Sequence, residues 1–234
     1  MKQSEFIKSL GELNIIINDI QLKQLHQYYN LLVEWNKIMN LTAIIDIDDV
    51  YLKHFYDSLT ITKVIDLNEI KTLCDIGTGA GFPGLVLKIV YPDLKIVLVD
   101  SLNKRVNFLK EVIKQLNLKN IEVVNARAEE YAINNREQFD VVTARAVAPL
   151  NILLEYCLPL VKINGFFIPM KGNINEELDN SSKALDILKA KLISKSTFLL
   201  PFEESNRTIL KIKKTEKTNV IYPRKYSDMK KKPL

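Results

Sequence analysis

The chain is 234 residues long and 47% apolar, which is enough to bury the core of one substantial domain with a modest appendage and argues against two large domains. Its formal charge of +5 favours a polyanionic partner such as nucleic acid, although a lysine-rich genome would produce the same bias. The two cysteines, Cys74 and Cys157, lie far apart in apolar stretches and suggest neither a disulfide framework nor a metal site. No apolar run is long enough to span a membrane. We therefore expect a cytoplasmic protein.

The first part of the chain has the pattern of helices. Between residues 19 and 36 apolar side chains recur every three or four residues, which predicts one stripe along an amphipathic helix. A second helix is expected to begin near Asp48 or Asp49, either of which could cap it, and to carry Phe55. We therefore expect residues 1–65 to form a helical cap and residues 66–234 the main domain, joined as one compact unit.

After Lys71 short β-rich runs alternate with helical periods, which is the pattern of a parallel α/β sheet. The predicted strands are residues 72–76, 95–99, 121–125, 139–143 and 165–170. Helices are expected between them, including residues 103–115, and a further helix is expected after them at about residues 176–191. Two closing strands are expected near residues 192–200 and 207–213.

A glycine-rich segment follows the first predicted strand. Residues 75–84 read Asp-Ile-Gly-Thr-Gly-Ala-Gly-Phe-Pro-Gly, and an apolar helix is expected over residues 85–90. Glycines at a strand-to-helix turn permit positive φ and let a ligand approach the backbone, so a nucleoside site is predicted here. Gly79, Gly81 and Gly84 also satisfy the G-x-G-x-x-G fingerprint of dinucleotide-binding domains.

Two observations separate these readings. Asp75 precedes Gly77 by two residues, an arrangement that resembles motif I of Rossmann-like methyltransferases and places a carboxylate near the cationic methionine end of S-adenosylmethionine. The same negative charge would repel the pyrophosphate of a dinucleotide. Both histidines, His26 and His54, lie in the cap, which leaves a dehydrogenase without an obvious acid-base residue in the sheet domain. The pattern therefore favours S-adenosylmethionine, with S-adenosylhomocysteine as product, over a nicotinamide cofactor.

Polar residues end the second and third predicted strands. Asp100 follows Gly79 by 100 − 79 = 21 residues, close to the ~20 expected for an acid that binds ribose hydroxyls. The alternative is a cap for the helix that begins near Asn103. Ala128 and Glu129 follow the third strand and are expected to face the adenine, unless this segment is an ordinary polar loop.

These segments together resemble the GidB/RsmG family of ribosomal RNA small-subunit methyltransferases. The resemblance covers most of the chain: residues 34–42 (Glu-Trp-Asn-Lys-Ile-Met-Asn-Leu-Thr), 54–58 (His-Phe-Tyr-Asp-Ser), 75–84, 100–105 (Asp-Ser-Leu-Asn-Lys-Arg), 127–129 (Arg-Ala-Glu), 144–146 (Ala-Arg-Ala), 171–172 (Lys-Gly) and 222–224 (Tyr-Pro-Arg). The tail departs from the family, where glycine and proline tend to follow Tyr-Pro-Arg. This chain instead continues with Tyr-Ser-Asp-Met before three lysines.

The resemblance implies an α/β, Rossmann-like S-adenosylmethionine-dependent methyltransferase fold, with a mostly parallel sheet, helices on both faces and an N-terminal helical cap. It also implies that the chain methylates N7 of a guanine in 16S ribosomal RNA. By similarity, family cofactor contacts correspond to Gly77, Phe82, Ala128, Glu129 and Arg145. With the glycine loop and the strand-end acid added, the predicted cofactor-binding set is Asp75, Gly77, Gly79, Gly81, Phe82, Asp100, Ala128, Glu129 and Arg145.

Methylation at guanine N7 needs no general base, because N7 has a free lone pair and no proton. The transfer depends instead on in-line positioning and desolvation. We expect Arg145 to bind the methionine carboxylate, the base or a phosphate, and Lys171 to contact an RNA phosphate or guanine O6. The alternatives are a surface arginine and a solvated lysine. His54 either faces the substrate or packs inside the cap.

The expected partner is 16S ribosomal RNA or the small ribosomal subunit, bound by a monomer. Because the major groove of A-form RNA is too narrow for a protein pocket, we expect the target guanine in a loop, bulge or opened junction. Basic residues expected to contact phosphates, each of which could also be a solvated charge, are Lys104, Arg105, Arg127, Arg224, Lys230, Lys231 and Lys232.

Three other functions remain open from the sequence. The first keeps S-adenosylmethionine and methylates a small molecule; salt-sensitive RNA binding would argue against it. The second is a non-catalytic RNA-binding ribosome assembly factor, which would bind the cofactor without transferring a methyl group. The third is a nicotinamide enzyme.

Overall fold

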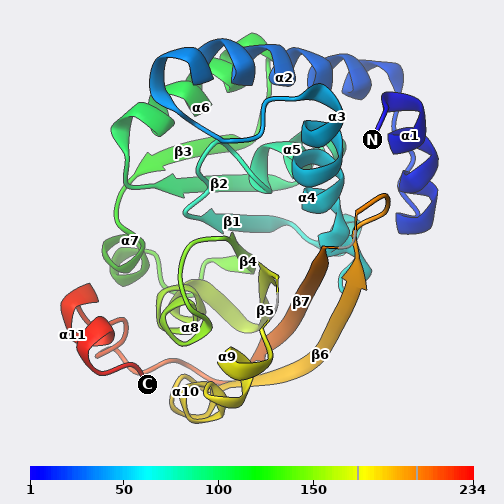
Figure 1. Ribbon diagram of the computed structural model, residues 1–234. Coiled ribbons are helices and arrows are strands. Elements are labelled where there is room, and N and C mark those ends of the chain that lie inside the picture. Colours follow the sequence, from blue (N-terminus) through cyan, green and yellow to red (C-terminus); the bar gives the residue numbers. More distant parts are fainter. Residues whose placement is uncertain (173, 204) are drawn as a thin grey trace.

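One mixed sheet runs through the molecule. The computed structural model describes residues 1–172, 174–203 and 205–234, and within them seven strands pair in the order β3-β2-β1-β4-β5-β7-β6 (Figure 1). β1 to β5 are parallel, whereas β7 is antiparallel to both β5 and β6. The strands are β1 (Thr72–Ile76), β2 (Lys95–Asp100), β3 (Ile121–Asn125), β4 (Phe139–Arg145), β5 (Val161–Lys171), β6 (Ala190–Leu199) and β7 (Asn206–Lys214).

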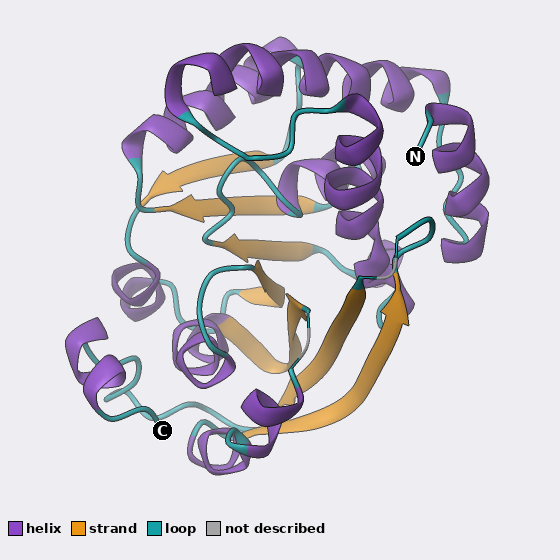
Figure 2. Ribbon diagram, in the orientation of Figure 1, coloured by secondary structure: helices purple, strands orange, loops and turns teal. Residues whose placement is uncertain are grey.

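Helices cover both faces of the sheet, and loops and turns join them to the strands (Figure 2). The helices are α1 (Gln3–Leu10), α2 (Asp19–Met39), α3 (Ile47–Val50), α4 (Asp57–Leu59), α5 (Gly84–Val90), α6 (Asn103–Gln115), α7 (Ala128–Asn134), α8 (Leu150–Cys157), α9 (Asn175–Asp179), α10 (Ser182–Ile187) and α11 (Tyr226–Lys231). A π-helical turn, Tyr51–Tyr56, joins α3 to α4.

Successive residues of the central strands point to opposite faces and join two different apolar cores. Leu73 on β1 and Ile96 on β2 belong to a cap-side core, which also contains residues of α1, α2, α5 and α6. Their neighbours Cys74 and Val97 pack in a tail-side core with residues of α7, α8, α10 and α11. The structure thus confirms the predicted mostly parallel sheet with helices on both faces and an N-terminal helical cap.

Several predicted boundaries are corrected. The helix predicted over residues 176–191 is two short helices, α9 and α10, and it ends earlier than predicted, because Lys189 adopts a left-handed φ of 60° and β6 already begins at Ala190. The cap of the second predicted helix is Asp46, not Asp48 or Asp49: its Oδ1 accepts from the backbone N–H groups of both, at 3.0 and 3.1 Å. Helix α1 was not predicted.

Candidate functional site

The glycine segment forms a tight loop between β1 and α5. Gly77, Gly79 and Gly81 have φ values of 67°, 62° and 102°, in the left-handed region that other residues rarely adopt. A Cβ on Gly77 would lie 2.6 Å from Cγ2 of Val147, so this position also lacks room for a side chain. Both constraints explain why the turn is built from glycine.

Asp75 braces this loop from within the protein. Its Oδ2 accepts hydrogen bonds from the Thr78 hydroxyl at 2.6 Å and the Gly84 N–H at 2.9 Å. Among the described residues its Oδ1 has no partner, although it is buried. Burial raises the pKa of Asp75 from 3.8 to about 6. Asp75 therefore organises the turn and keeps one acceptor atom unused.

A cavity of about 350 Å³, which we call the loop cavity, lies where the parallel strands end. Its volume is in the range of small-molecule sites. Residues at or directly after the ends of β1 to β4 line it, together with residues of α6, α7, α8 and α11. They are Ile76, Gly77, Val99, Asp100, Ser101, Leu102, Arg105, Ala126, Arg127, Ala128, Glu129, Ala146, Val147, Tyr156 and Tyr226.

Asp100 links two turns at the edge of the loop cavity. Its Oδ2 accepts from the Gly79 N–H and its Oδ1 from the Leu102 N–H, both at 2.9 Å, and Arg105 Nη1 lies 3.5 Å from Oδ2. Leu102 is the N-cap residue of α6 and makes no side-chain cap hydrogen bond, so the bond from its N–H to Asp100 lies just before the helix and leaves the capping alternative open. A carboxylate can accept further hydrogen bonds, which leaves Asp100 able to bind a ligand hydroxyl.

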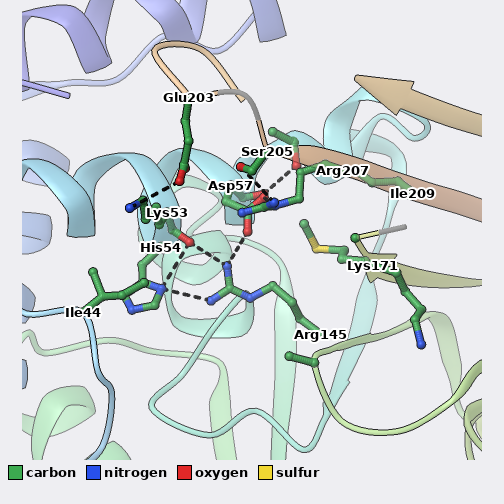
Figure 3. Close-up of a pocket in the computed structure, with 14 residues that line it drawn as sticks. Ile44, Lys53, His54, Asp57, Arg145, Lys171, Glu203, Ser205, Arg207 and Ile209 are labelled. Carbon is green, nitrogen blue, oxygen red and sulfur yellow. Dashed lines mark hydrogen bonds and ion pairs between the residues drawn. The ribbon is translucent and has the colours of Figure 1, made fainter. Parts of the chain in front are cut away.

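A second cavity, of about 420 Å³, lies between the cap and the ends of β4, β5 and β7, and we call it the cap cavity (Figure 3). It is lined by Ile44, Lys53, His54, Asp57, Thr60, Arg145, Ala146, Met170, Lys171, Gly172, Glu203, Ser205, Arg207 and Ile209.

Two arginines meet at one buried carboxylate in the cap cavity. Arg145 Nη1 lies 2.8 Å from Asp57 Oδ2, and Arg207 Nε lies 2.9 Å from Asp57 Oδ1 (Figure 3). Arg145 also donates to the backbone carbonyl of Lys53 at 3.1 Å. Asp57 is 5% exposed, so this network fixes both guanidinium groups with little solvent access.

His54 both packs inside the cap and lines the cap cavity, so the two alternatives for it do not exclude each other. Its ring stacks on Phe82 with 4.2 Å between centroids, and its Nε2 lies 3.0 Å from the Thr42 hydroxyl. Burial and the neighbouring Arg145 charge lower the pKa of His54 to about 3. The imidazole is therefore neutral at physiological pH. The Arg145 guanidinium also lies over the Phe82 ring, 5.3 Å from its centroid.

Ala146 belongs to both cavities. It follows Arg145 at the end of β4 and has a φ of 56°, a left-handed conformation that is unfavourable for alanine. Such strain is often kept at functional sites. The two cavities therefore meet at the Arg145–Ala146 junction.

The structure distributes the predicted cofactor residues unevenly. Gly77, Asp100, Ala128 and Glu129 line the loop cavity, whereas Arg145 lines the cap cavity. Asp75, Gly79, Gly81 and Phe82 line neither cavity: the first three form or brace the loop, and Phe82 packs against His54.

Lys171 lines the cap cavity, but its ammonium group is engaged elsewhere. Its Nζ lies 2.6 Å from Glu177 Oε2 and donates to the Ala148 carbonyl at 3.0 Å. Figure 3 shows this group pointing away from Arg145. A direct contact of Lys171 with substrate, which stays a prediction, would compete with this ion pair.

The predicted RNA-binding residues fall into two groups. Lys104 at the start of α6, Arg127 before α7 and Lys230 to Lys232 in the tail are exposed, and Arg105 is half-buried. Arg224 instead points inward: its Nε and Nη2 bind the two carboxylate oxygens of Glu155 at 2.8 and 2.7 Å, and Nη1 donates to the Lys232 carbonyl. We therefore leave Arg224 out of the proposed RNA surface.

Among the cavity residues that the sequence did not single out, four matter most for the site: Asp57, Arg207, Tyr156 and Tyr226. Asp57 could have been recognised as a candidate site residue, because it is an acid within the aromatic run of residues 54–58. The other three lie on segments whose place beside the cavities depends on the sheet order and on the path of the tail.

The described part of the chain contains no group of three or more His, Cys, Asp or Glu side chains placed to hold a metal ion. No helix in that part is both long and apolar enough to cross a membrane. Cys74 and Cys157 are buried free thiols.

Comparisons with known proteins agree with this architecture. The model of the family described as GidB, rRNA small subunit methyltransferase G, matches residues 21–209. A relative from Lachnoclostridium phytofermentans is 50% identical over 99% of this chain and 97% of its own length, and one from Exiguobacterium sibiricum is 47% identical over the whole of both chains. Both are named ribosomal RNA small subunit methyltransferase G.

Among solved structures, a SAM-dependent methyltransferase from Aquifex aeolicus superposes with a TM-score of 0.53 at 19% identity, over 71% of this chain and 93% of that chain. A likeness at this identity concerns the fold alone. It confirms the predicted fold class.

Proposed function

The chain belongs to the GidB family of rRNA small subunit methyltransferases, and from this premise we propose that it methylates N7 of one guanine in 16S ribosomal RNA. Membership of the family makes the chain an S-adenosylmethionine-dependent rRNA methyltransferase. The proposal has four parts. The substrate is 16S ribosomal RNA or the small subunit, the methylated atom is N7, the protein is a monomer, and it acts in the bacterial cytoplasm.

The observation that carries this proposal is the meeting of the two cavities at Ala146. Methyl transfer requires donor and acceptor atoms to approach in line at close range. A nucleoside methyl donor in the loop cavity and an acceptor base in the cap cavity would both lie next to Ala146. We therefore assign the loop cavity to the cofactor and the cap cavity to the target guanine.

The residues of the loop cavity fit S-adenosylmethionine. The glycine turn brings backbone close to the ligand, and Asp100 stands at the end of β2 where an acid can bind ribose hydroxyls. Gly77, Ala128 and Glu129 line the same cavity, and the unpartnered Oδ1 of Asp75 adds negative charge behind the loop. When bound, S-adenosylmethionine supplies a methyl group on a positively charged sulfur.

The cap cavity fits an acceptor that has no proton to lose. Asp57 is held between two guanidinium groups, and His54 is neutral with a pKa of about 3, so neither is poised as a general base. Guanine N7 needs none. In this proposal Arg145, fixed by Asp57, binds the base or an adjacent phosphate, and closure of the cavity around the base excludes water.

The basic residues around the loop cavity support an RNA partner. Exposed Lys104 and Arg127 and half-buried Arg105 follow the carboxyl ends of β2 and β3, and Lys230 to Lys232 lie at the end of α11 and directly after it. Phosphate contacts of this kind make binding weaken as salt concentration rises. A small-molecule methyltransferase would not show that dependence for its substrate.

The proposal is tested with radiolabelled S-adenosylmethionine and small-subunit RNA or particles that lack the modification. We expect label at one guanine, mapped by chemical cleavage at 7-methylguanine. Gly77→Asp and Arg145→Ala should abolish or greatly reduce labelling in folded protein, because the first fills the loop turn and the second removes the fixed guanidinium. Lys110→Ala, an exposed change on α6, is the control and should retain activity.

Three results would decide against parts of the proposal. Label on pyrimidines alone would overturn the N7 assignment. Cofactor binding without methyl transfer to any ribosomal RNA would favour a non-catalytic assembly factor. Methyl transfer to a small molecule, with no salt-sensitive RNA binding, would favour a metabolite as substrate.

A further inference from the structure

The tail of the chain forms part of the wall of the loop cavity. Tyr226, the first residue of α11, lines this cavity together with Tyr156 of α8 and Asp100 at the end of β2. Tyr156 is 6% exposed and Tyr226 is 41% exposed, so one ring lies inside the cavity wall and the other lies at its opening. From the sequence alone, the only expected role of the tail is contact with RNA phosphates.

A buried ion pair holds the tail in this position. Glu155 on α8 is 1% exposed and accepts from Arg224 through both carboxylate oxygens, at 2.8 and 2.7 Å. Its Oε1 also accepts from the Arg224 backbone N–H at 2.8 Å. A bidentate pair of this kind fixes orientation as well as distance. Met229, three residues beyond Tyr226, is fully buried in the tail-side core and anchors the other end of the short helix.

The position of α11 indicates which part of a nucleoside ligand Tyr226 would meet. The methyl group must be presented at Ala146, where the loop cavity adjoins the cap cavity. Figure 1 shows α11 beside α7 and α8, on the far side of α8 from β7, which carries Arg207 of the cap cavity. Tyr226 lines the loop cavity and not the cap cavity, and it lies near Tyr156 and Glu129, so it belongs to the end of the site opposite the methyl group, where the adenine and ribose are expected.

The neighbours of the two tyrosines agree with an adenosine subsite. Burial raises the pKa of the Tyr156 hydroxyl, and Glu129 and Tyr226 add to this effect because both lie close to it. Glu129 follows β3, the segment expected to face adenine. Two phenol rings, the carboxylates of Asp100 and Glu129 and the apolar side chains of Leu102 and Val147 line the cavity together. Such a surface suits a flat aromatic base with polar edges.

We propose that Tyr226 is a cofactor-binding residue that packs against the adenosyl group, and that Glu155 and Arg224 are positioning residues that hold it there. This inference rests on the proposed function, because it takes the loop cavity as the cofactor site. It makes the tail part of the catalytic domain rather than a separate basic arm.

The test measures binding of S-adenosylhomocysteine and of 5′-methylthioadenosine, which lacks the amino-acid portion, by calorimetry. We expect Tyr226→Ala to weaken both ligands by the same factor, about fivefold or more, since the lost contact is with adenosine. Tyr226→Phe keeps the ring and should bind within about twofold of the wild type. Ser227→Ala, an exposed change on the same helix, is the matched control and should bind normally.

The role of the ion pair is tested with Glu155→Gln in protein shown to be folded by its circular dichroism. We expect weaker binding of both ligands, with no further loss when Tyr226→Ala is added, because both changes remove the same contact. Independent effects that multiply would overturn the positioning role.

The outcomes separate this inference from the function on which it rests. If the wild type binds neither ligand, the assignment of the loop cavity fails, and this inference fails with it. If the wild type binds both ligands and Tyr226→Ala binds them equally well, the proposed function stands and only the role of the tail is overturned. A loss for S-adenosylhomocysteine but not for methylthioadenosine would place Tyr226 at the wrong end of the cofactor and also overturn the proposal.

Discussion

At the scale of single residues, the site depends on polar groups whose charge is set by burial. His54 is a cap residue that contacts the glycine loop: it stacks on Phe82 and lies 3.0 Å from the Thr42 hydroxyl. An imidazolium there would be buried beside the Arg145 guanidinium, so the neutral ring is favoured and the pKa falls to about 3. His54 therefore stays uncharged in the folded protein over a pH range in which it would bind a proton in the unfolded chain.

This difference makes stability depend on pH. The folded pKa lies below the unfolded value of about 6.5, so the stabilising contribution is present above pH ~6.5 and is lost as the pH falls toward 3. We expect the free energy of unfolding of wild type to fall more steeply between pH 7 and pH 5 than that of His54→Gln, measured by urea denaturation. Titration of Asp75 is common to both proteins and cancels in the comparison.

The control for this prediction is His26→Gln, since His26 is the other histidine of the chain and is exposed on α2. It should follow the wild type across the pH range. A constant difference in unfolding free energy between wild type and His54→Gln from pH 7 to pH 5 would contradict the prediction.

At the scale of elements, helix α2 supports the glycine loop from the cap. The Tyr28 hydroxyl donates to the carbonyl of Ala80 inside the loop, and its ring stacks on Phe82 with 5.5 Å between centroids. A Cβ on Gly81 would lie 2.7 Å from the same hydroxyl, which shows how closely the helix approaches the loop. The helix therefore positions loop residues that are more than 50 positions away in the chain.

We expect Tyr28→Phe to destabilise the protein by about 1–3 kcal/mol, because the change leaves a buried carbonyl without its donor. It should also weaken binding of S-adenosylhomocysteine, because the loop loses its support. Urea denaturation and calorimetry measure the two effects. Tyr29→Phe removes the hydroxyl of an adjacent tyrosine whose bond to the Ile45 carbonyl is exposed, and it should change stability by less than about 0.5 kcal/mol. Equal effects of the two substitutions would argue against a specific role for the Tyr28 bond.

At the scale of the whole molecule, the cap and the sheet share one apolar core. The cap-side core contains Leu25 and Leu32 of α2, Leu85 of α5, and Leu73 and Leu98 of the central strands. Gln21 adds a polar connection, because its amide donates to the carbonyls of Ile89 and Val90 at the end of α5. The cap is therefore required to bury one face of the sheet.

We expect a fragment of residues 66–234 not to fold cooperatively, since loss of the cap would expose the apolar face of α5 and the strands behind it. Circular dichroism during urea denaturation would show a broad or absent transition. A sharp transition at the midpoint of the full chain would mean that the sheet domain is stable by itself and that the cap is an independent unit.

Much of the fold follows from short-range patterns in the sequence. The five parallel strands, the long helix α2 and the helix over Asn103–Gln115 were predicted because alternation and helical periodicity depend on neighbouring residues. The glycine segment and the spacing from Gly79 to Asp100 indicated a nucleoside site for the same reason: the local chemistry is contained in a few adjacent positions. The cofactor, the family and the reaction class could be predicted at this level.

The pairing of distant residues was decided only by the tertiary structure. Asp57 and Arg207 are 150 positions apart, and they meet because β7 is inserted antiparallel between β5 and β6. Tyr226 reaches the loop cavity because Arg224 is bound by Glu155, 69 positions earlier. Periodicity determines which face of an element is apolar, but it does not determine which distant face will cover it. That choice depends on the packing of the whole chain, so the glycine loop could be read from the sequence and the walls of the two cavities could not.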